Sequence, residues 1–260
     1  GLRNRGTLVI ADSTVSSNVT ASDGGAIYTA GAVAASTLSG NITATASTIS
    51  VANIANFPAQ PGFVVLVGNE QMRVSAILGT TFTVERAVNG STATVHSAGD
   101  AVSVVNLSLA NVTVTMNIAD FGAAVFNDDG TVAITGSTLL SNSATTDGGG
   151  VYNDRTATLN IVGSTLVSNT AGRDGGGVYN NDSATASITD STVNGNIATR
   201  NGGGLFNEIV AIVNLTNSRF SANSAADGGG IYNEDGQVVI SGGSLIANDS
   251  SGDGGGLLAT

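Results

Sequence analysis

The sequence predicts an all-β fold: a single-stranded parallel β-helix, or solenoid, of about seven coils, with a small β-rich module inserted near its start. A motif recurs about every 26 residues, and the apolar residues inside each repeat alternate with the period of two that is typical of strands. No segment carries the apolar stripe of an amphipathic helix. Because about 26 residues are too few for a propeller blade, we expect each repeat to form one coil of three short strands and three turns.

Each repeat begins at a glycine turn. The motif is Asp-Gly-Gly, replaced once by Asn-Gly-Gly-Gly and once by a degenerate copy at Asp120. From Asp120 onward, successive copies are 27, 27, 27, 26 and 26 residues apart. The turns begin at Asp23, Asp120, Asp147, Asp174, Asn201, Asp227 and Asp253. Glycine tolerates the positive φ of a tight corner, so these turns are expected to form one corner of every coil. A phosphate-binding loop would need a following helix and usually a lysine, and neither is present in this sequence.

An aliphatic–aromatic pair follows each turn. The aromatic members include all four tyrosines of the chain and are Tyr28, Phe126, Tyr152, Tyr179, Phe206 and Tyr232, and Leu257-Leu258 closes the series. In a strand the two members of a pair point to opposite faces. The aliphatic members are expected to point inward and to form a ladder between coils stacked about 4.8 Å apart.

The rest of the repeat reads as two further strands. An apolar-x-apolar step, as at 159–161, leads to a step such as Ser164-Thr165-Leu166, and an asparagine follows. These asparagines are Asn18, Asn142, Asn169, Asn196, Asn223 and Asn248. Asparagine amides at equivalent turns can stack and satisfy the backbone at each level. One coil cannot bury its own apolar face, so neighbouring coils must stabilise it.

An insertion interrupts the array. From Tyr28 to Phe126 the chain runs 98 residues, which is one coil and about 72 more. We therefore assign residues 1–31 and 105–260 to the β-helix and residues 32–104 to an inserted module. This segment holds both prolines and the only histidine, His96. Its alternating stretches predict strands at 47–51, 63–67, 71–77 and 81–85, in a compact barrel-like or hairpin unit at a corner of the solenoid.

The repeat resembles a known class. Gly-Gly-aliphatic-aromatic-Asn, followed by Leu-x-Ile-x-x-Ser-x-aliphatic-x-x-Asn, is similar to the right-handed parallel β-helix repeats of bacterial surface proteins. Polymorphic outer-membrane proteins and adhesin-like autotransporter passengers are the families it resembles, over residues 1–29 and about 105–260. The resemblance implies a right-handed coil and an extracellular or cell-surface location, and no particular activity. The insertion resembles a small module of phage-associated and bacterial extracellular proteins.

Composition excludes several functional classes. The chain has 19 acidic and 8 basic residues, a net charge of −11 and no basic cluster, which argues against a nucleic-acid partner. It has no cysteine, so disulfides, thiolate metal sites and cysteine nucleophiles are excluded. No run of 18 apolar residues occurs, so no membrane insertion is expected.

Catalysis is not expected either. Polysaccharide-degrading enzymes with a β-helix fold carry carboxylates and basic groups on long loops over a groove. The turns of this solenoid are short and uniform, and they contain no lysine or histidine. A polysaccharide-degrading enzyme is therefore less favoured than a structural protein or an adhesin. Ice binding is a separate possibility, because ice-binding solenoids carry flat, regular rows of threonine. Here the Ser-Thr pairs become irregular toward the C-terminus, so ice binding is not favoured.

A row of carboxylates is the candidate metal site. Asp147, Asp174, Asp227 and Asp253 occupy the same repeat position. Stacked carboxylates about 5 Å apart repel one another, and calcium, which takes oxygen ligands, would relieve the repulsion. Alternatively, each aspartate caps its own turn through its side chain, an interpretation that Asn201 in the same row favours. Calcium is the only cofactor that the sequence suggests.

The aromatic row is the candidate ligand-binding site. If the rings point outward between small neighbours such as Ala124 and Gly150, they form a flat apolar stripe of the kind that contacts proteins or sugars. The alternative is that the rings lie inside, or beneath the module or their own turns.

The prediction that copies of the chain assemble rests on the two ends of the solenoid. Gly1-Leu2-Arg3-Asn4 and Leu257-Leu258 occupy the same phase of the repeat, and neither end shows a capping helix. Open strand edges recruit other strands, so copies would stack head to tail into a filament, or the chain is a segment of a longer repeat protein. We expect an extracellular structural protein, a β-solenoid fibre subunit or adhesin stalk, whose partners are other copies of itself. A surface adhesin that binds glycans or cell-surface components through the aromatic ladder is the alternative.

Overall fold

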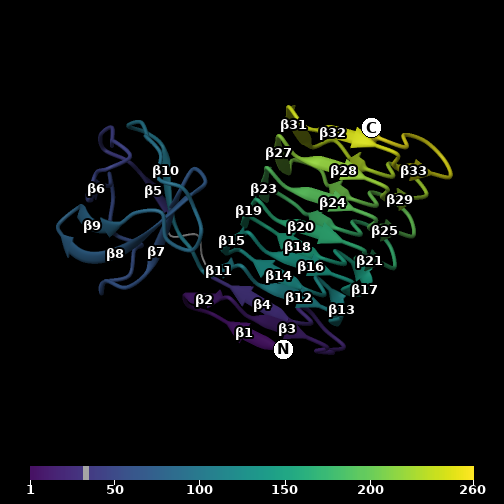
Figure 1. Ribbon diagram of the computed structural model, residues 1–260, viewed down its shortest axis with the longest axis horizontal. Coiled ribbons are helices and arrows are strands. Elements are labelled where there is room, and N and C mark those ends of the chain that lie inside the picture. The colour runs from purple at the N-terminus through teal and green to yellow at the C-terminus, as the bar shows by residue number, and fades with distance from the viewer. Residues whose placement is uncertain (32–34) are drawn as a thin grey trace.

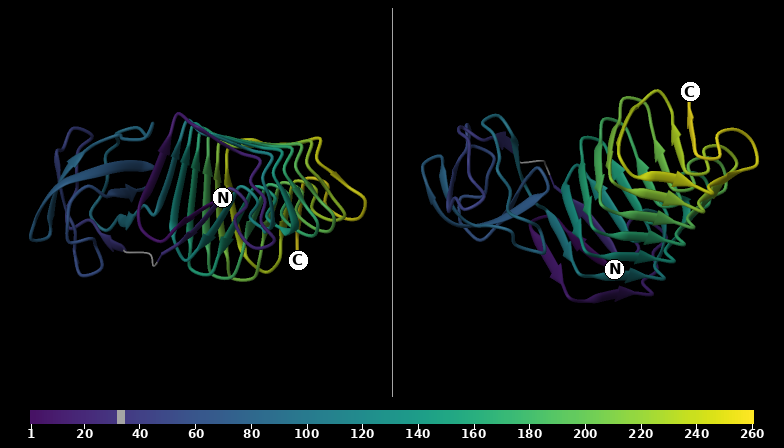
Figure 2. Two further views of the ribbon diagram at one scale, coloured as in Figure 1. Left: turned by 90° about the horizontal axis from the view of Figure 1, so that it is seen from below. Right: turned by 45° about the horizontal axis from the view of Figure 1, so that its top comes forward.

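The computed structural model describes residues 1–31 and 35–260 and shows a parallel β-solenoid with a small barrel beside it (Figure 1). Every helix or strand element in the described residues is a strand. Successive coils follow one another along one axis (Figure 2), with their strands parallel and in register. The all-β solenoid fold predicted from the sequence is therefore confirmed.

Four faces run along the solenoid, and we name them by their strands. Face A contains β1 (Leu2–Asn4), β4 (Ile27–Ala30), β14 (Val125–Asp128), β18 (Val151–Asp154), β22 (Val178–Asn180), β26 (Leu205–Asn207), β30 (Ile231–Asn233) and β34 (Leu257–Ala259). Face B contains β2 (Leu8–Ala11), β11 (Leu107–Ala110), β15 (Thr131–Thr135), β19 (Thr158–Val162), β23 (Thr185–Thr189), β27 (Ile212–Thr216) and β31 (Gln237–Ser241).

The other two faces have shorter strands. Face C contains β3 (Thr14–Ser16), β12 (Thr113–Thr115), β16 (Thr138–Leu140), β20 (Thr165–Val167), β24 (Thr192–Asn194), β28 (Arg219–Ser221) and β32 (Ser244–Ile246). Face D contains β13 (Ile118–Phe121), β17 (Ser143–Asp147), β21 (Thr170–Ala171), β25 (Ile197–Ala198), β29 (Ser224–Ala225) and β33 (Asp249–Ser250). Face A has eight strands in the described residues, so the solenoid has slightly more turns than the seven coils expected.

Each coil has one strand more than the three predicted. The extra strand belongs to face D, where β21, β25, β29 and β33 have two residues each. A two-residue strand shows no alternation of apolar and polar positions, so periodicity cannot detect it.

Inward-pointing aliphatic side chains form a continuous core. One ladder lies inside face A and consists of Ile27, Val125, Val151, Val178, Leu205 and Ile231, all 0% exposed. Parallel pairing in register puts the same side chain at the same place in every coil, so like residues stack on like. Each such side chain contributes roughly 1.5–3 kcal/mol through burial.

The corner between faces D and A depends on glycine. Gly175 represents it: its φ is +68°, and a Cβ at this position would lie 2.7 Å from the carbonyl oxygen of Val178. A side chain there would therefore collide with the backbone that follows the turn. This close approach explains why the Gly-Gly motif recurs in every coil.

A ladder of buried asparagines joins the coils at the corner between faces C and D. Nδ2 of Asn142 donates to Oδ1 of Asn169 at 2.9 Å, and Asn169 donates to Asn196 in the same way, also at 2.9 Å. The backbone N–H of Asn142 donates to the same oxygen of Asn169 at 3.0 Å. The full ladder is Asn18, Asn117, Asn142, Asn169, Asn196, Asn223 and Asn248. It satisfies buried backbone groups at every level, as such groups require.

A second asparagine ladder lies at the end of the face A strands. Its members are Asn127, Asn153, Asn180, Asn207 and Asn233, each donating to the next at 2.7–2.9 Å. Before Asn127 the same column holds Thr29 instead of asparagine. Oδ1 of Asn127 consequently has no hydrogen-bond partner among the described residues.

The inserted module is a closed barrel, at the left of Figure 1. Its strands are β5 (Ala35–Thr37), β6 (Thr48–Ser50), β7 (Val64–Val67), β8 (Glu70–Leu78), β9 (Thr81–Glu85) and β10 (Ala101–Val104), in the antiparallel order β5-β10-β7-β8-β9-β6. An antiparallel bridge between Leu38 and Val51 joins the two outer strands and closes the sheet. Phe57, Phe63 and Phe82 pack in its core with ring centroids 5.3–6.3 Å apart.

Four strands of the barrel lie where the sequence pattern places them, namely β6 to β9. β5 and β10 were not expected, because their segments show no clear alternation flanked by turn residues. The expected start of the module, residue 32, lies outside the described residues. The module is inserted between β4 and β11, at the corner between faces A and B. In the next coil the same corner, between β14 and β15, is only two residues long.

The barrel rests on face B. An apolar contact joins Val64, Leu66, Val88 and Val105 with Ala133 of β15. Gln71 lies in the contact at 1% exposure, donates from Nε2 to Oγ1 of Thr135 at 3.2 Å and accepts a hydrogen bond from Oγ of Ser108 at 2.8 Å. A buried amide with both ends paired fixes the barrel in one position on the solenoid.

Candidate functional site

The six aromatic side chains form one stacked column on the outer side of face A. Neighbouring ring centroids lie 4.8–5.4 Å apart and the ring planes are inclined by 3–17°. Their aliphatic partners belong to the interior core, so the rings point outward as strand alternation requires. Stacked aromatic pairs contribute about 0.5–1.5 kcal/mol each beyond their buried area.

The column is not the exposed apolar stripe expected from the sequence. Its four inner rings, Phe126, Tyr152, Tyr179 and Phe206, are only 3–9% exposed. Each ring face lies against the next ring, so only ring edges remain on the outside. The C–H groups of a sugar approach the electron-rich face of an aromatic ring, and these faces are occupied. The prediction that the row binds a ligand as a flat stripe is therefore wrong for the inner rings.

Phe121 contributes to this burial. It lies at the end of β13, and its ring meets Tyr152 nearly edge-on, with centroids 5.4 Å apart and planes inclined by 78°. Phe121 follows the degenerate turn residue Asp120 and lies in register with Asp23 and Asp147, so it occupies the place that the turn aspartate has in the neighbouring coils. Tyr152 is thus covered by the turn of the neighbouring coil, not by its own turn.

A groove of about 310 Å³ opens beside the first rungs of the column. It is lined by Asp23, Tyr28, Phe121, Phe126, Asp128, Tyr152, Asp154, Arg155 and Asn181. Asp23 precedes the corner between faces D and A, whereas Asp128 and Asp154 end successive face A strands. Two corners of the solenoid therefore form the walls, and the aromatic edges form the floor.

The polar groups of the groove bind one another. The Tyr28 hydroxyl donates to Oδ2 of Asp128 at 2.6 Å, and the Arg155 guanidinium pairs with the other oxygen of the same carboxylate. Nδ2 of Asn181 donates to Oδ1 of Asp154 at 2.7 Å. These contacts hold the side chains in place while leaving carboxylate lone pairs toward the groove.

Burial and crowding of carboxylates set the charge state of this groove. Burial, and then repulsion from Asp120, Asp128 and Asp154, raises the pKa of Asp23 above its ordinary value. Burial and the hydrogen bond to Asp128 raise the pKa of Tyr28 to about 12. Tyr28 therefore stays a neutral hydroxyl donor near pH 7, and the groove offers carboxylate acceptors to a ligand with hydroxyl groups.

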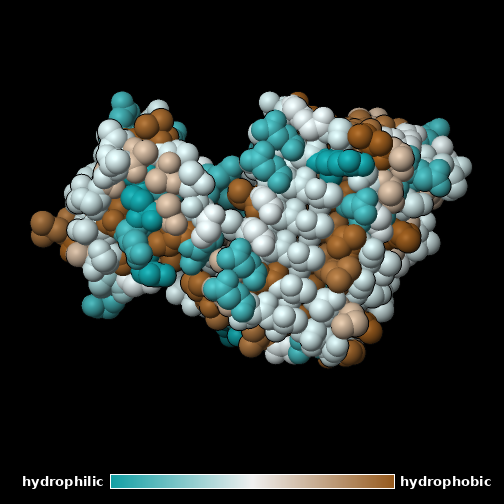
Figure 3. All heavy atoms as spheres, in the orientation of Figure 1, coloured by the Kyte–Doolittle hydropathy of each residue, from teal (hydrophilic) through white to brown (hydrophobic). Residues whose placement is uncertain are grey.

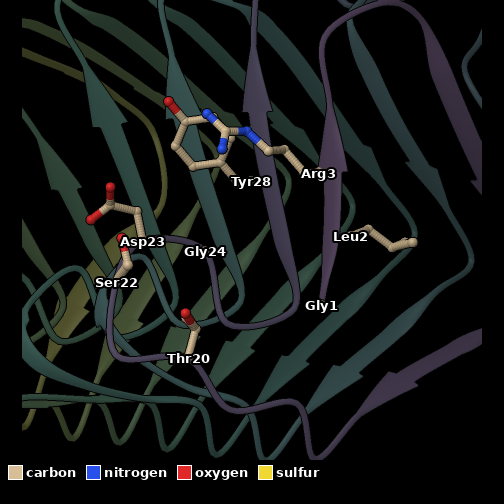
Figure 4. A pocket seen from close by; sticks show the side chains of 8 residues that line it. All are labelled: Gly1, Leu2, Arg3, Thr20, Ser22, Asp23, Gly24 and Tyr28. Carbon is tan, nitrogen blue, oxygen red and sulfur yellow. The ribbon is translucent and has the colours of Figure 1, made fainter.

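Arg3 covers the outer face of the first ring. Its guanidinium carbon lies 4.9 Å from the centroid of Tyr28, over the ring, as Figure 4 shows. Both residues border a second hollow of about 300 Å³, together with Asp23 and the glycine turn of the first coil. A cation over an exposed ring contributes about 0.5–1 kcal/mol.

The assembly residues expected from the sequence lie at opposite ends of the solenoid. Gly1 precedes β1, and Leu2, Arg3 and Asn4 of β1 pair with β4. Leu257 and Leu258 lie in β34 and pair with β30. β1 and β34 are the two outermost strands of face A.

The four predicted calcium ligands lie in one column, and the carboxylates of Asp147, Asp174 and Asp227 bind protein groups. Asp147 accepts the backbone N–H of Asp174 at 3.0 Å and pairs with Arg173 at 3.1 Å. Asp174 accepts the N–H of Asn201 at 2.9 Å and pairs with Arg200. Asp227 accepts the N–H of Asp253 at 2.7 Å. In residues 1–31 and 35–260, no three or more His, Cys, Asp or Glu side chains come together in a group that could hold a metal ion, so the structure does not bring the predicted calcium ligands together. Arginines and backbone amides neutralise the inner carboxylates.

A buried ion cluster inside the barrel was not evident from the sequence. Glu70 is 1% exposed; its Oε1 accepts from Nε of Arg86 at 2.6 Å, and its Oε2 accepts from Nη2 of Arg86 at 2.7 Å. Nε2 of His96 lies 2.8 Å from the same Oε2. Burial acts to raise the pKa of Glu70, but the hydrogen bonds from Arg86 and His96 outweigh it and hold this pKa below its ordinary value. The three residues belong to different segments of the module, so no local motif announces them.

One comparison with known proteins concerns the repeat. Residues 12–30 match the family model of the Chlamydia polymorphic membrane protein repeat. The matched segment contains β3, the first glycine corner and β4 with Tyr28. The chain is a parallel β-helix repeat protein. In this segment it is similar to the polymorphic membrane proteins that its repeat resembles. No curated protein sequence matches the chain.

Several solved phage tailspikes are also similar to the chain. The tailspike gp61 of Pseudomonas phage phi297 is 15% identical with a TM-score of 0.35, over 92% of this chain and 48% of the tailspike. The tailspike gp49 of Pseudomonas phage LKA1 is 13% identical with a TM-score of 0.26, over 90% and 53%. The Gp54 tailspike of Acinetobacter baumannii bacteriophage AP22, solved in complex with capsular saccharide, is 10% identical with a TM-score of 0.23, over 92% and 58%. The chain therefore spans about half the length of these tailspikes.

No helix among the described residues is long and apolar enough to cross a membrane.

Proposed function

We propose that the chain is an extracellular or cell-surface structural protein, a rigid β-helical stalk without catalytic activity. The observation that carries this proposal is that side-chain ladders join the coils to one another in addition to the strand pairing. Asparagines join them at the corner between faces C and D, and stacked rings join them on face A. Separating two coils breaks backbone pairing on four faces together with these ladders, which suits a load-bearing element.

Force spectroscopy on the full chain, held at its two ends, tests the stalk function. We expect the solenoid to resist until single coils detach, and to give repeated steps of about one repeat length each. Asn169→Ala, which removes a central ladder member, is expected to lower the force of the steps around it, whereas Asp182→Asn at an exposed corner is the matched control. Gradual extension at low force, with no steps, would contradict the proposal.

The same solenoid supports a non-catalytic role. The most buried solenoid carboxylates, those of Asp147 and Asp174, hold backbone N–H groups and arginines. In the groove, Asp128 is bound by Tyr28 and Arg155. Incubation with a panel of bacterial polysaccharides is expected to release no reducing ends, and release by the purified chain would overturn this part of the proposal.

Head-to-tail stacking is the finer form of the stalk proposal. β1 and β34 border the same parallel sheet, so β34 of one copy presents the edge that β1 of the next copy requires. Leu2 and Leu257 are 45% and 37% exposed on these strands. A contact of this kind does not close on itself and gives filaments.

Electron microscopy and light scattering over a range of concentrations test the stacking. We expect filaments that Leu257→Asp abolishes and that Ile197→Asp leaves intact, since Ile197 is an exposed apolar residue of β25 on a central coil. A monomer at every concentration would contradict stacking between copies and leave the stalk proposal to the force experiment.

Glycan binding is the second candidate function, and the groove beside the first rungs favours it. The groove offers carboxylate oxygens, the Asn181 amide and the edges of aromatic rings, a combination suited to hydrogen bonding with sugar hydroxyls. Binding would rest on hydrogen bonds, because the inner ring faces are occupied.

A glycan array probed with the full chain tests this candidate. Asp154→Ala is expected to weaken binding at least tenfold, whereas Glu234→Ala, in the same column but outside the groove, is expected to leave binding unchanged. A chain that binds no glycan, or an Asp154→Ala variant that binds as well as the wild type, would remove the candidate.

A further inference from the structure

We propose that the cleft between the barrel and face B binds a neutral polyhydroxylated ligand of the size of one sugar ring. The cleft has a volume of about 230 Å³. Asn69, Glu70, Gly90, Ser91, Thr92 and Thr94 line it from the barrel, and Val162, Thr189 and Asp190 line it from the solenoid. The site is separate from the groove on face A, and it does not depend on the stalk function.

The cleft exists because the barrel covers only part of face B. Along one outward column of this face, Ser108, Ala133 and Asn160 are 0%, 0% and 4% exposed, whereas Ser187 in the next coil is half-buried. The space-filling view shows the barrel and the solenoid touching below and separated above (Figure 3). The edge of the contact thus falls between β19 and β23, where Val162 and Thr189 lie.

Both walls are fixed in place without a ligand. Gln71, which directly follows Glu70, is held on face B by its hydrogen bonds to Ser108 and Thr135. At the cleft itself, Nδ2 of Asn69 reaches Oγ1 of Thr189 at 3.3 Å. A preformed pocket between two folded units loses little conformational freedom on binding, which favours affinity for a small ligand.

The lining groups define the chemistry of the ligand. Hydroxyl and amide side chains predominate, with the methyl groups of Val162 as an apolar contact. The charge of Glu70 is balanced inside the barrel by Arg86, so Asp190 provides the remaining charge of the lining. The described lining residues include no arginine, lysine or histidine, so an anion has no partner, whereas hydroxyl donors find carboxylate and hydroxyl acceptors.

Size and shape narrow the class further. Pockets for drug-sized ligands have volumes of roughly 300–1,000 Å³, so this cleft is matched to a smaller compound. Its described lining contains no aromatic ring on which a flat base would stack. A neutral compound with several hydroxyl groups on one ring fits both the volume and the hydrogen-bonding groups.

Ligand-observed NMR on the full chain tests the proposal, with glucose and N-acetylglucosamine as neutral probes and glucuronate as the anionic probe. We expect saturable binding of at least one neutral probe and at least tenfold weaker binding of glucuronate. Thr189→Phe fills the cleft and is expected to weaken the neutral probe at least tenfold. Thr216→Phe occupies the same outward column one coil further and is the matched control.

Three outcomes would overturn the proposal: no binding of either neutral probe, equal binding of glucuronate, or unchanged binding by Thr189→Phe. Asp154→Ala separates the cleft from the groove on face A, and binding lost in this variant but kept in Thr189→Phe would assign the ligand to that groove. Circular dichroism melts verify that each variant folds. Should Thr189→Phe fail to fold, Asn69→Ala on the exposed turn of the barrel takes its place.

Discussion

Each buried asparagine of the corner ladder serves two coils at once. Asn169 accepts hydrogen bonds from the backbone N–H and from Nδ2 of Asn142, and its own Nδ2 donates to Asn196 and to the carbonyl of Leu139. A buried group that loses its partner keeps its full desolvation penalty. One side chain thus determines the pairing of groups in three successive coils.

Replacement of Asn169 is therefore expected to be severe. Asn169→Ala leaves the backbone and side-chain donors of Asn142 and the carbonyl of Leu139 without this partner, whereas Oδ1 of Asn196 keeps the backbone N–H of residue 169. We expect the loss to cost about 3–5 kcal/mol of unfolding free energy. Asn18→Ala at the half-buried start of the ladder is expected to cost about 1 kcal/mol, since water reaches the freed groups there. Guanidinium denaturation measures both, and equal losses would contradict the ladder as the cause.

The second asparagine ladder offers a stabilising change. Thr29 occupies the column position before Asn127, whose Oδ1 has no partner among the described residues. Thr29→Asn would supply an Nδ2 donor to this oxygen and is expected to add about 1 kcal/mol of stability. The thermal midpoint measures the change. Thr14→Asn on face C, away from any ladder, is the control, and a lower midpoint for Thr29→Asn would show that the column cannot accept the larger amide.

Asp147 gives the solenoid a pH dependence. Burial raises the pKa of Asp147 to about 6, against opposing effects of the Asp174 N–H and Arg173. Because this folded-state pKa exceeds the ordinary value of 3.8, protonation stabilises the fold, and that stabilisation is lost as the pH rises through about 6. Asp147→Asn is neutral at every pH and is expected to gain stability relative to wild type between about pH 4 and pH 7.

Thermal melts across that pH range measure the effect of Asp147→Asn. Asn201 already occupies the same column in another coil, so the substitution fits the turn. Asp182→Asn, at an exposed corner, is the control. A stability difference from wild type that does not change with pH would contradict the assignment to Asp147.

At the scale of the element, the aromatic column acts as a single stack. Tyr179 lies between Tyr152 and Phe206, with ring centroids 4.8 Å away on both sides. Tyr179→Ala is expected to cost about 3–5 kcal/mol because it leaves a cavity within the stack. Tyr179→Phe is expected to cost at most about 1 kcal/mol, since only the 3.3 Å hydrogen bond to Glu208 is lost. Chemical denaturation compares the two, and similar losses would mean that the hydroxyl, rather than stacking, stabilises the column.

The elements also mark how far a sequence predicts this structure. Asp-Gly-Gly, the aliphatic–aromatic pair and the asparagine each recur because each coil repeats one local geometry, so their positions in the coil follow from the sequence. The burial of the rings does not follow, because it depends on stacking geometry and on Phe121 from a neighbouring coil. Face D is too short to show a period, and the Glu70 cluster joins segments that are distant in sequence.

At the scale of the whole molecule, stability is a sum over neighbouring coils. Removal of residues 155–181 deletes one coil and joins Asp154 to Asp182. The next strand after this junction is then β23, which takes the place of β19 on face B. We expect this variant to fold with its circular dichroism spectrum preserved and to be about 4.8 Å shorter along the axis. Removal of 155–167, about half a coil, puts unlike faces in contact and is expected to prevent folding. A folded half-coil variant would show that register between faces is not what specifies the solenoid.

The corner ladder also gives the solenoid a direction. From Asn18 to Asn223, each Nδ2 donates one hydrogen bond to Oδ1 of the next asparagine toward the C-terminus, so the amide-to-amide bonds run one way along the axis. Such an array is electrically polar in the manner of a helix, with acceptor oxygens facing one way and donor N–H groups the other. A coil added to this axis matches the array in one orientation only, because the reverse orientation would bring donor against donor. The side chains, as well as the parallel strands, thus make any longer assembly of such coils a one-way structure.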